Sequence, residues 1–492
     1  MRSGTGLLPT SLKLRRAGSV TLIIIGLIAY AFLKRANLNL SAGDQWVYFA
    51  ASHLFADGIL PYRDFFFSHG PLQILLSTLL VKIGASIPVL SLLPALIYGM
   101  SALTLFSLVR ERMGTVRALL AFLLFLFSYA NLMGSLYYTG QELGLLLFLL
   151  GLLFFLRQKK LTAGLLVGLS VCASINMLVT AFVLTIFQFF WNKKKLPALL
   201  SGMAGSFGVI HLIFTVIAGS AFWKQVYLYH LAKPDESVRL AGSGKVFLFM
   251  GNAHGLLLIL ALAGAILLWF GWRRGNFEEE PERQKLLLLS AALTVAQILF
   301  LALIHPIFPH YFVPIAPFIA ILGAEALIFG SEYVLKKWKG RDFIRSAVPA
   351  VIILVLLAWN TVHTLRFYRI EQILLGVPHA REVAAVVRES VPEDATIFGE
   401  FGIAPLISLL SGRRLAGNEV DTSEMRIFSG ETTLDAFIKI IEEDNVQILV
   451  NRELRGINAY PPFWKYRDRH FFLARTFKAS GYPTVIELWK RK

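Results

Sequence analysis

The sequence has 492 residues, of which 56% are hydrophobic and only 16% are charged, with a formal net charge of +17. This composition excludes a soluble protein of this length and predicts a polytopic membrane protein. The positive charge does not indicate nucleic-acid binding, because residues 366–492 hold 18 Lys and Arg against 17 Asp and Glu, and the excess lies in the apolar part. The single cysteine, Cys172, excludes an intramolecular disulfide.

Eleven apolar segments, separated by polar breaks, are predicted to cross the membrane. They lie near residues 18–36, 88–109, 116–133, 142–156, 161–175, 177–191, 197–218, 246–270, 286–304, 312–330 and 346–364. With the N-terminus in the cytoplasm, the loops on that side carry 22 Lys and Arg and the opposite loops carry 8. This bias predicts a multi-pass protein of the cytoplasmic membrane whose first outer loop and C-terminal domain are extracytoplasmic. The first segment lacks a cleavage pattern and is predicted to stay in place as a span.

The loop of residues 37–87, which follows the first span, gathers ionisable side chains: Asp44, His53, Asp57, Arg63, Asp64 and His69. Ionisable groups near lipid are energetically costly, so this cluster predicts a functional site. Apolar residues at helical spacing predict two short helices, over residues 46–54 and 72–83. Both are too short to cross a bilayer and are expected to lie in the membrane interface. The Phe65 to Phe67 run between them is either a membrane anchor or the wall of a lipid groove.

Residues 1–370 form the predicted membrane module, and residues 371–492 have the pattern of a small water-soluble α/β domain. Helices are expected over residues 381–389, 404–410 and 432–443, and strands over 395–398, 447–450, 471–478 and 484–489. No catalytic set is visible in this domain, and its charges at Arg413, Arg414, Asp421 and Glu424 are interpreted as surface charges. Acceptor binding, cover for an active site and partner contact all remain open as its role.

Several motifs follow one another in a characteristic order: Gly43-Asp44-Gln45, Pro61-Tyr62-Arg63-Asp64, His69-Gly70-Pro71-Leu72 and His310-Tyr311-Phe312, then a soluble domain after the last span. This order resembles the GT-C superfamily of lipid-linked sugar transferases, in the branch of protein O-mannosyltransferases and the aminoarabinose transferase that modifies lipid A. The resemblance implies a GT-C fold and transfer of a sugar, with inversion, from a polyprenyl-phosphate donor to a lipid, glycan or protein acceptor. Such a reaction needs a base beside the acceptor, cations for the phosphate and a groove for the lipid.

Two carboxylates receive roles from this resemblance. Asp44 corresponds to the first-loop acid of the family and is the candidate catalytic base, although the usual Asp-Glu pair is Asp44-Gln45 here. The alternative is that Asp44 only caps the helix that follows. Glu142 matches a second acid of the family, and together with Asp44 it is the candidate site for a divalent cation, Mg²⁺ or Mn²⁺. The alternative is that Glu142 sits in water at a helix N-terminus, where the helix dipole favours it.

Six residues are the candidates for binding the donor phosphate: Arg63, His69, Lys233, Arg239, His310 and Tyr311. Arginine offers a planar donor fork that suits phosphate oxygens, and the resemblance places His69 and the His310-Tyr311 pair near the phosphate. For Arg63, the alternative is an ion pair with Asp64 or Asp57. For the two loop cations the alternative is solvated charge, and for His310 it is a buried, hydrogen-bonded histidine.

Two other classes of function remain open. A transporter or lipid flippase would place ionisable groups at the bilayer midplane and show paired halves with broken helices. A polymerase or ligase of surface glycans would share the lipid-phosphate chemistry but usually has its large loop between late spans. In this sequence the charges gather in outer loops, and the informative loop follows the first span. No phosphate-binding loop, dinucleotide fingerprint or zinc spacing supports an ATP-driven, nicotinamide-linked or zinc activity.

Overall fold

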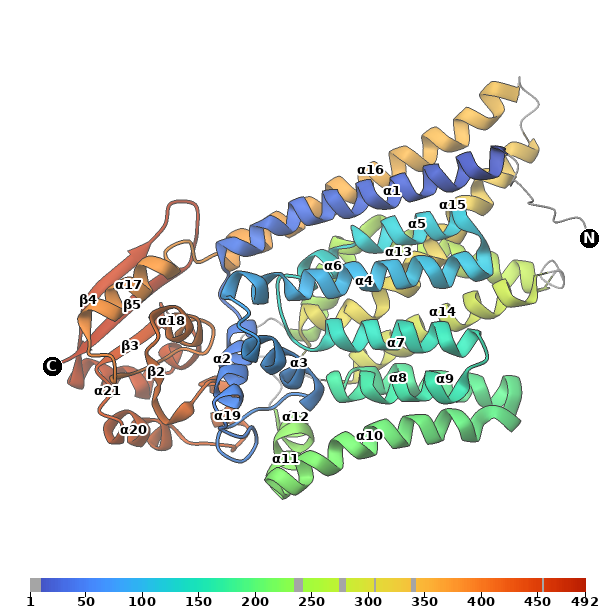
Figure 1. The fold of residues 1–492 in the computed structure, drawn as a ribbon. Helices are drawn as coiled ribbons and strands as arrows, with labels where there is room; N and C mark the ends of the chain where they lie inside the picture. Colours follow the sequence, from blue (N-terminus) through green and yellow to red (C-terminus); the bar gives the residue numbers. More distant parts are fainter. Residues whose placement is uncertain (1–9, 234–241, 274–279, 305–306, 338–341, 454) are drawn as a thin grey trace, which may run out of the picture.

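The protein is a polytopic α-helical membrane protein with a small C-terminal α/β domain, as predicted. The computed structural model describes residues 10–233, 242–273, 280–304, 307–337, 342–453 and 455–492. Long apolar helices run roughly side by side, and the α/β domain sits at one end of them (Figure 1). The loop of residues 37–87 lies between these two parts and contacts both (Figure 1).

The apolar segments fold as helices, because continuous apolar runs satisfy their backbone groups internally within a bilayer. They form α1 (Thr10–Lys34), α4 (Ile87–Met113), α5 (Thr115–Leu126), α6 (Tyr129–Gly134), α7 (Gln141–Leu156), α8 (Lys160–Ala173), α9 (Met177–Asn192), α10 (Leu196–Ala218), α13 (Gly242–Arg273), α14 (Pro281–Leu303), α15 (Ala316–Lys337) and α16 (Asp342–Leu375). All eleven predicted segments coincide with helices. Among the described residues, 6 helical stretches are long and apolar enough to cross a membrane, and shorter apolar helices accompany them. The number of eleven crossings therefore stays a prediction.

Three of the predicted spans are interrupted, one of them by a kink at Gly255 within α13. The segment at residues 116–133 breaks after α5, where the Ser128 hydroxyl accepts a hydrogen bond from the N–H of Asn131 and starts α6. The segment at residues 312–330 begins as a 3₁₀ helix, η5 (Pro309–Ile315), before α15. Pro314, inside this turn, lacks the N–H that a regular α-helix would need there, whereas Pro309 stands in the first turn, where that N–H has no helical partner. These last two breaks place short irregular backbone at the end of the bundle near the first loop.

The two helices predicted in the first loop are α2 (Gln45–Ala56) and α3 (Pro71–Lys82). Helix α2 runs across the ends of the membrane helices and lies between these ends and the C-terminal domain (Figure 1). All of its residues from Gln45 to Ser52 are buried, because the C-terminal domain covers the side turned away from the bundle. The N–H of Gly43 also donates to the carbonyl oxygen of Gly402 at 3.0 Å, which ties the start of α2 to that domain.

The C-terminal domain is a five-stranded mixed sheet with helices packed on it. Strand β1 (Thr396–Gly399) pairs in parallel with β2 (Arg414–Leu415) and β3 (Ile448–Arg452), and β5 (Val485–Arg491) pairs antiparallel with β3 and β4 (Phe471–Lys478). Its helices are α17 (Ala380–Ser390), α18 (Ala404–Ser411), α19 (Glu424–Phe428), α20 (Leu434–Glu443) and α21 (Pro461–His470). The three predicted helices and four predicted strands are all confirmed. Strand β2 and helices α19 and α21 were not predicted, because they are short or lack an apolar face.

Helices α8 and α10 approach each other closely through small residues. A Cβ atom on Gly164 would lie 2.1 Å from the carbonyl oxygen of Leu199, and one on Gly202 would lie 2.3 Å from that of Leu161. Only glycine fits at such a backbone contact, which is the common way in which membrane helices pack. This contact fixes α8, whose C-terminal end reaches the cavity described below.

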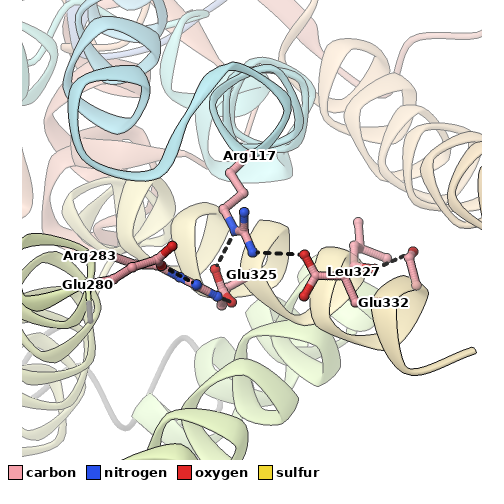
Figure 2. A network of polar contacts seen from close by, with 7 residues as sticks. Arg117, Glu280, Arg283, Glu325, Leu327 and Glu332 are labelled. Carbon is pink, nitrogen blue, oxygen red and sulfur yellow. Dashed lines mark hydrogen bonds and ion pairs between the residues drawn. The ribbon is translucent and has the colours of Figure 1, made fainter. Parts of the chain in front are cut away.

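A cluster of charged side chains joins α5, α14 and α15 at their far end (Figure 2). The Glu325 carboxylate, only 3% exposed, accepts from Arg117 at 2.9 Å and from Arg283. Arg283 also pairs with Glu280, and Arg117 contacts Glu332 at 3.4 Å. Each buried charge thus has an opposite charge as its neighbour, as buried ionisable groups require.

Candidate active site

A cavity of about 390 Å³ lies where the membrane helices, the first outer loop and the C-terminal domain meet. Five of the residues predicted for the site line this one cavity: Asp44, His69, Lys233, His310 and Tyr311. They come from three regions of the sequence that are more than 70 residues apart. One wall is apolar and belongs to α9 and α14, where Leu178, Val179, Phe300 and Ile304 line it. Another wall is the segment 421–425 of the C-terminal domain.

Asp44 stands immediately before α2, and its carboxylate faces the cavity. Its side chain makes no capping hydrogen bond to the helix, so the capping alternative is wrong. Burial raises the pKa of Asp44 to about 6, and the carboxylate of Asp421 acts in the same direction. The cationic groups of Lys233 and Arg452 oppose this rise. A carboxylate with such a pKa is ionised at neutral pH and is still basic enough to take a proton.

The C-terminal domain supports Asp44 through a buried ion pair. Arg452 donates to Glu400 from Nε at 2.8 Å and makes a second, parallel contact from its terminal nitrogen. The N–H of Gly402 donates to the same carboxylate at 3.0 Å, and the Gly402 carbonyl accepts from Gly43. A continuous chain of contacts thus runs from the ion pair to the residue before Asp44. These residues were not predicted, because they lie more than 350 positions away in the sequence.

The histidines of the cavity are neutral at neutral pH. Burial lowers the pKa of His69 well below its usual value, with His230 and Lys233 acting in the same direction. Burial also lowers the pKa of His230 to about 3. Nε2 of His230 lies 2.6 Å from the carbonyl oxygen of Ser68 and therefore carries the hydrogen. The His69 ring packs against Tyr48 at 4.5 Å between centroids.

Lys233 is the only Lys or Arg among the described residues that line the cavity. Its Nζ lies 4.8 Å from the centre of the Tyr229 ring, which also lines the cavity. Because the surrounding histidines are neutral, Lys233 supplies the positive charge of this wall. The His310 ring also lines the cavity. It stacks on the Phe308 ring with 5.7 Å between centroids and packs edge to face against the Tyr311 ring with 4.8 Å between centroids.

Arg63, one of the predicted phosphate ligands, lies at the surface and is not part of the cavity lining. Arg63 is 54% exposed and pairs with Asp64, donating from Nε at 2.8 Å and from Nη2 at 3.0 Å. Its side chain does not line the cavity, so the ion-pair alternative describes its surroundings. Arg239 lies outside the described residues.

Glu142 does not line the cavity, and its carboxylate accepts hydrogen bonds from the turn that precedes its own helix. Its Oε2 accepts from the N–H of Thr139 at 3.2 Å and its Oε1 accepts from the N–H of Gly140 at 3.0 Å. The side chain is fully buried, so the expectation that it sits in water is wrong. Because Glu142 is not among the residues that line the cavity with Asp44, the cation site shared by these two carboxylates stays a prediction. Within the described ranges, no group of three or more His, Cys, Asp or Glu is placed to hold a metal ion.

Several cavity residues were missed or misread in the sequence. Asp421 and Glu424 line the cavity and are not mere surface charges. Arg413 is also buried, and its Nη2 donates to the carbonyl oxygens of Arg388 and Val391 at 2.9 and 3.1 Å. No local signal marks Asp421 and Glu424, because their position depends on how the C-terminal domain docks onto the first loop, whereas Arg413 is buried by contacts within its own domain.

The Phe65 to Phe67 run is buried inside the protein, so its interpretation as a membrane anchor is wrong. The Phe66 ring packs edge to face against Tyr229 at 5.2 Å between centroids. The guanidinium of Arg426, from the C-terminal domain, lies 4.2 Å from the centre of the same ring. Phe66 therefore joins the first loop to two other walls of the cavity.

No family model and no curated protein matches the chain. Solved structures do resemble it. ArnT from Cupriavidus metallidurans in the apo state has a TM-score of 0.63 at 14% identity, covering 96% of this chain and 98% of that chain. The same protein bound to undecaprenyl phosphate has a TM-score of 0.62 at 13% identity, covering 95% of this chain and 97% of that chain.

The apo oligosaccharyltransferase of Archaeoglobus fulgidus has a TM-score of 0.58 at 13% identity, covering 88% of this chain and 69% of that chain. Its complex with Zn and sulfate has a TM-score of 0.59 at 15% identity, covering 94% of this chain and 72% of that chain. Identities this low carry an argument about fold alone. Both ArnT and the oligosaccharyltransferase are GT-C glycosyltransferases, and this chain therefore has the GT-C fold that the order of its motifs resembles.

Proposed function

We propose that the protein transfers a sugar from a polyprenyl-phosphate donor to an acceptor at the outer face of the membrane, with inversion at the anomeric carbon. One observation carries this proposal: the Asp44 carboxylate, the Lys233 ammonium and the neutral His69 and His310 line one cavity. A base and a set of phosphate-binding groups are the two chemical requirements of such a transfer. The GT-C fold shared with ArnT and the oligosaccharyltransferase supports the same reaction class.

The apolar wall of the cavity suits the lipid part of the donor. Leu178 and Val179 on α9, with Phe300 and Ile304 on α14, continue from the cavity into the membrane module. A polyprenyl chain lies against such side chains without leaving the apolar phase. The structure of ArnT bound to undecaprenyl phosphate supports a lipid phosphate of this kind.

The positive charge of Lys233 attracts the phosphate of the donor. Lys233 is the cationic side chain of the cavity wall, and His69 and His310 are neutral side chains able to donate hydrogen bonds. Ammonium and imidazole donors stabilise the phosphate oxygens, on which negative charge grows as the leaving group departs. The hydroxyl of Tyr311 lines the same region and adds a further donor.

The transfer is a single displacement. Asp44 accepts the proton of an acceptor hydroxyl, whose oxygen then forms a bond to the anomeric carbon of the sugar. The bond between this carbon and the phosphate oxygen breaks on the opposite side, which inverts the configuration and releases the polyprenyl phosphate. The protonated Asp44 afterwards loses its proton to water. The acceptor approaches from the wall formed by segment 421–425, because the lipid and phosphate take the other sides.

Reconstitution in liposomes with a panel of radiolabelled polyprenyl-phosphate sugars tests this function. The panel compares wild type with Asp44→Asn and with Asp57→Asn, which makes the same change at an exposed carboxylate of the same loop. We expect transfer by wild type and Asp57→Asn, and a loss of at least about a hundredfold in Asp44→Asn, as for removal of a general base. Full turnover by Asp44→Asn would show that Asp44 is not the base.

A further inference from the structure

One end of the cavity differs in chemistry from the rest. Thr139, Gln141, Ser174 and Asn176 line it with hydroxyl and amide groups only. The neighbouring lining residues Gly70, Pro71, Ala173 and Ile175 are uncharged as well. The charged lining residues Asp44, Lys233, Asp421 and Glu424 belong to other segments. A polar but uncharged surface is suited to a ligand that is rich in hydroxyl groups.

Two glycines bring this end of the cavity together. A Cβ on Gly70 would lie 2.4 Å from the carbonyl oxygen of Cys172, and one on Gly140 would lie 2.5 Å from that of Ala173. The turn after His69 and the start of α7 therefore both press against the C-terminal end of α8. The chain then breaks between α8 and α9, at residues 174–176, where the largely buried Ser174 and Asn176 line the cavity. Three segments thus converge beside His69.

Gln141 indicates that this end receives a ligand. Its side chain lines the cavity and is only 3% exposed, and its Oε1 has no hydrogen-bond partner among the described residues. A buried amide oxygen without a donor is unfavourable, and native proteins rarely leave one unpaired. This oxygen is not accessible from the cavity in this rotamer, so a ligand hydroxyl supplies the missing donor after the amide group turns over. Rotation about the last side-chain torsion exchanges the amide oxygen and nitrogen, so a ligand can be met by either.

We propose that Thr139, Gln141, Ser174 and Asn176 form the subsite for the sugar of the donor, and that this subsite takes an uncharged sugar through its hydroxyl groups. The inference rests on the proposed function, because it assigns one end of the same cavity. It follows from the separation of chemistry within the cavity: the phosphate requires the charged and histidine-lined walls, and the sugar next to it meets the uncharged end beside His69.

The test measures the affinity of the detergent-purified full-length protein for two radiolabelled probes. One is undecaprenyl phosphate, and the other is the undecaprenyl-phosphate sugar that the donor panel finds active. We expect Gln141→Leu to weaken binding of the sugar-bearing lipid at least about tenfold, since one lost hydrogen bond to a buried amide is of that order. Binding of undecaprenyl phosphate should change less than about twofold. Gln188→Leu, the same change at a buried glutamine of α9 outside the cavity, is the control and should alter neither.

Ser174→Ala is a second, smaller change in the same subsite and keeps the test decisive if Gln141→Leu does not fold. Equal weakening of both probes, or no change in either for both variants, would overturn the sugar subsite. An undecaprenyl-phosphate glucuronate that competes as well as the matching glucose lipid would overturn the preference for an uncharged sugar. A wild-type protein that binds no undecaprenyl phosphate would instead overturn the proposed function itself, and the inference with it.

Discussion

Asp44 and Asp421 line the same cavity from two parts of the chain, and the charge of Asp421 raises the pKa of Asp44. Asp44 belongs to the first outer loop, whereas Asp421 belongs to the C-terminal domain. One Asp421 oxygen accepts from the N–H of Ser423 at 2.9 Å, so its position is fixed by its own segment. The C-terminal domain therefore lines the cavity and also adds to the rise in the pKa of Asp44, of which burial is the larger cause.

Removing the charge of Asp421 should shift the pH dependence of transfer. Asp44 works as a base only when ionised, so kcat/KM of wild type should rise with pH through about 6. In Asp421→Asn one source of the raised pKa is gone, so the rise should move to lower pH. The pH profile of kcat/KM measures this. Asp435→Asn, at an exposed acid of the same domain, should keep the wild-type profile, and an unshifted profile in Asp421→Asn would contradict the coupling.

Asp44→Asn should lose activity and yet gain stability at alkaline pH. The pKa of Asp44 is raised on folding from an ordinary value near 4 to about 6. Its favourable contribution to stability is therefore complete below about pH 4 and is lost as pH rises through about 6. Removing the charge should raise the free energy of unfolding at pH 8 by about 1–3 kcal/mol. Thermal unfolding in detergent at pH 4 and pH 8 measures it, and a lower melting temperature at pH 8 would argue against a strained carboxylate.

Much of the candidate site was predictable from the sequence. The rest depends on how the C-terminal domain packs onto α2. Asp44, His69 and His310 were predicted because the order of the motifs around them resembles the GT-C superfamily, and because ionisable groups gather in the first loop. Asp421 was not, since it reaches the cavity only through the contact between the C-terminal domain and α2. Arg63 was predicted as a phosphate ligand, whereas in the structure it pairs with its neighbour Asp64 and does not line the cavity.

The fold shows the same division. Apolar runs and the change of pattern near residue 370 predicted the helices and the α/β domain, since each element is set by its own periodicity. The break before α6 was not predicted, because Ser128 caps that helix within an otherwise apolar run. The burial of Glu142 could not be predicted either, since its partners are backbone N–H groups of the preceding turn. Sequence patterns predict which residues are apolar. Which polar atoms have hydrogen-bond partners within the protein depends on tertiary contacts.

Lys233 and Arg63 should differ sharply in their effect on lipid-phosphate binding. Lys233 lines the cavity, whereas Arg63 is exposed and paired with Asp64. We expect Lys233→Gln to raise the Kd for undecaprenyl phosphate about tenfold, because a charge-assisted hydrogen bond is lost. Arg63→Gln should change it less than about twofold, as is usual for an exposed ion pair. The two variants make the same change of charge. Equal losses of affinity for undecaprenyl phosphate in both would show that the phosphate binds close to Arg63.

Thiol labelling should place the candidate site on the outer side of the membrane. Cys172 is buried, and a Cys172→Ser background leaves single introduced cysteines to react. Asp57→Cys and Ser429→Cys should be labelled by an impermeant reagent from outside intact cells, and Lys194→Cys, in the exposed turn after α9, only after the membrane is opened. The positive-inside bias gives this expectation. Labelling of Asp57→Cys and Lys194→Cys from the same side would overturn the orientation.

Gly164→Ala should destabilise the protein, whereas Gly205→Ala should not. A Cβ on Gly164 would lie 2.1 Å from the Leu199 carbonyl oxygen, but nothing lies within 4 Å of one on Gly205. We expect the first change to cost about 1–3 kcal/mol through overpacking. The second should be neutral or stabilising by up to about 1 kcal/mol, because alanine is the better helix former. Thermal unfolding in detergent measures both. The first change should also lower donor affinity, because a displaced α8 moves Ser174 at the end of the cavity, and an unchanged affinity would show that this end tolerates movement of α8.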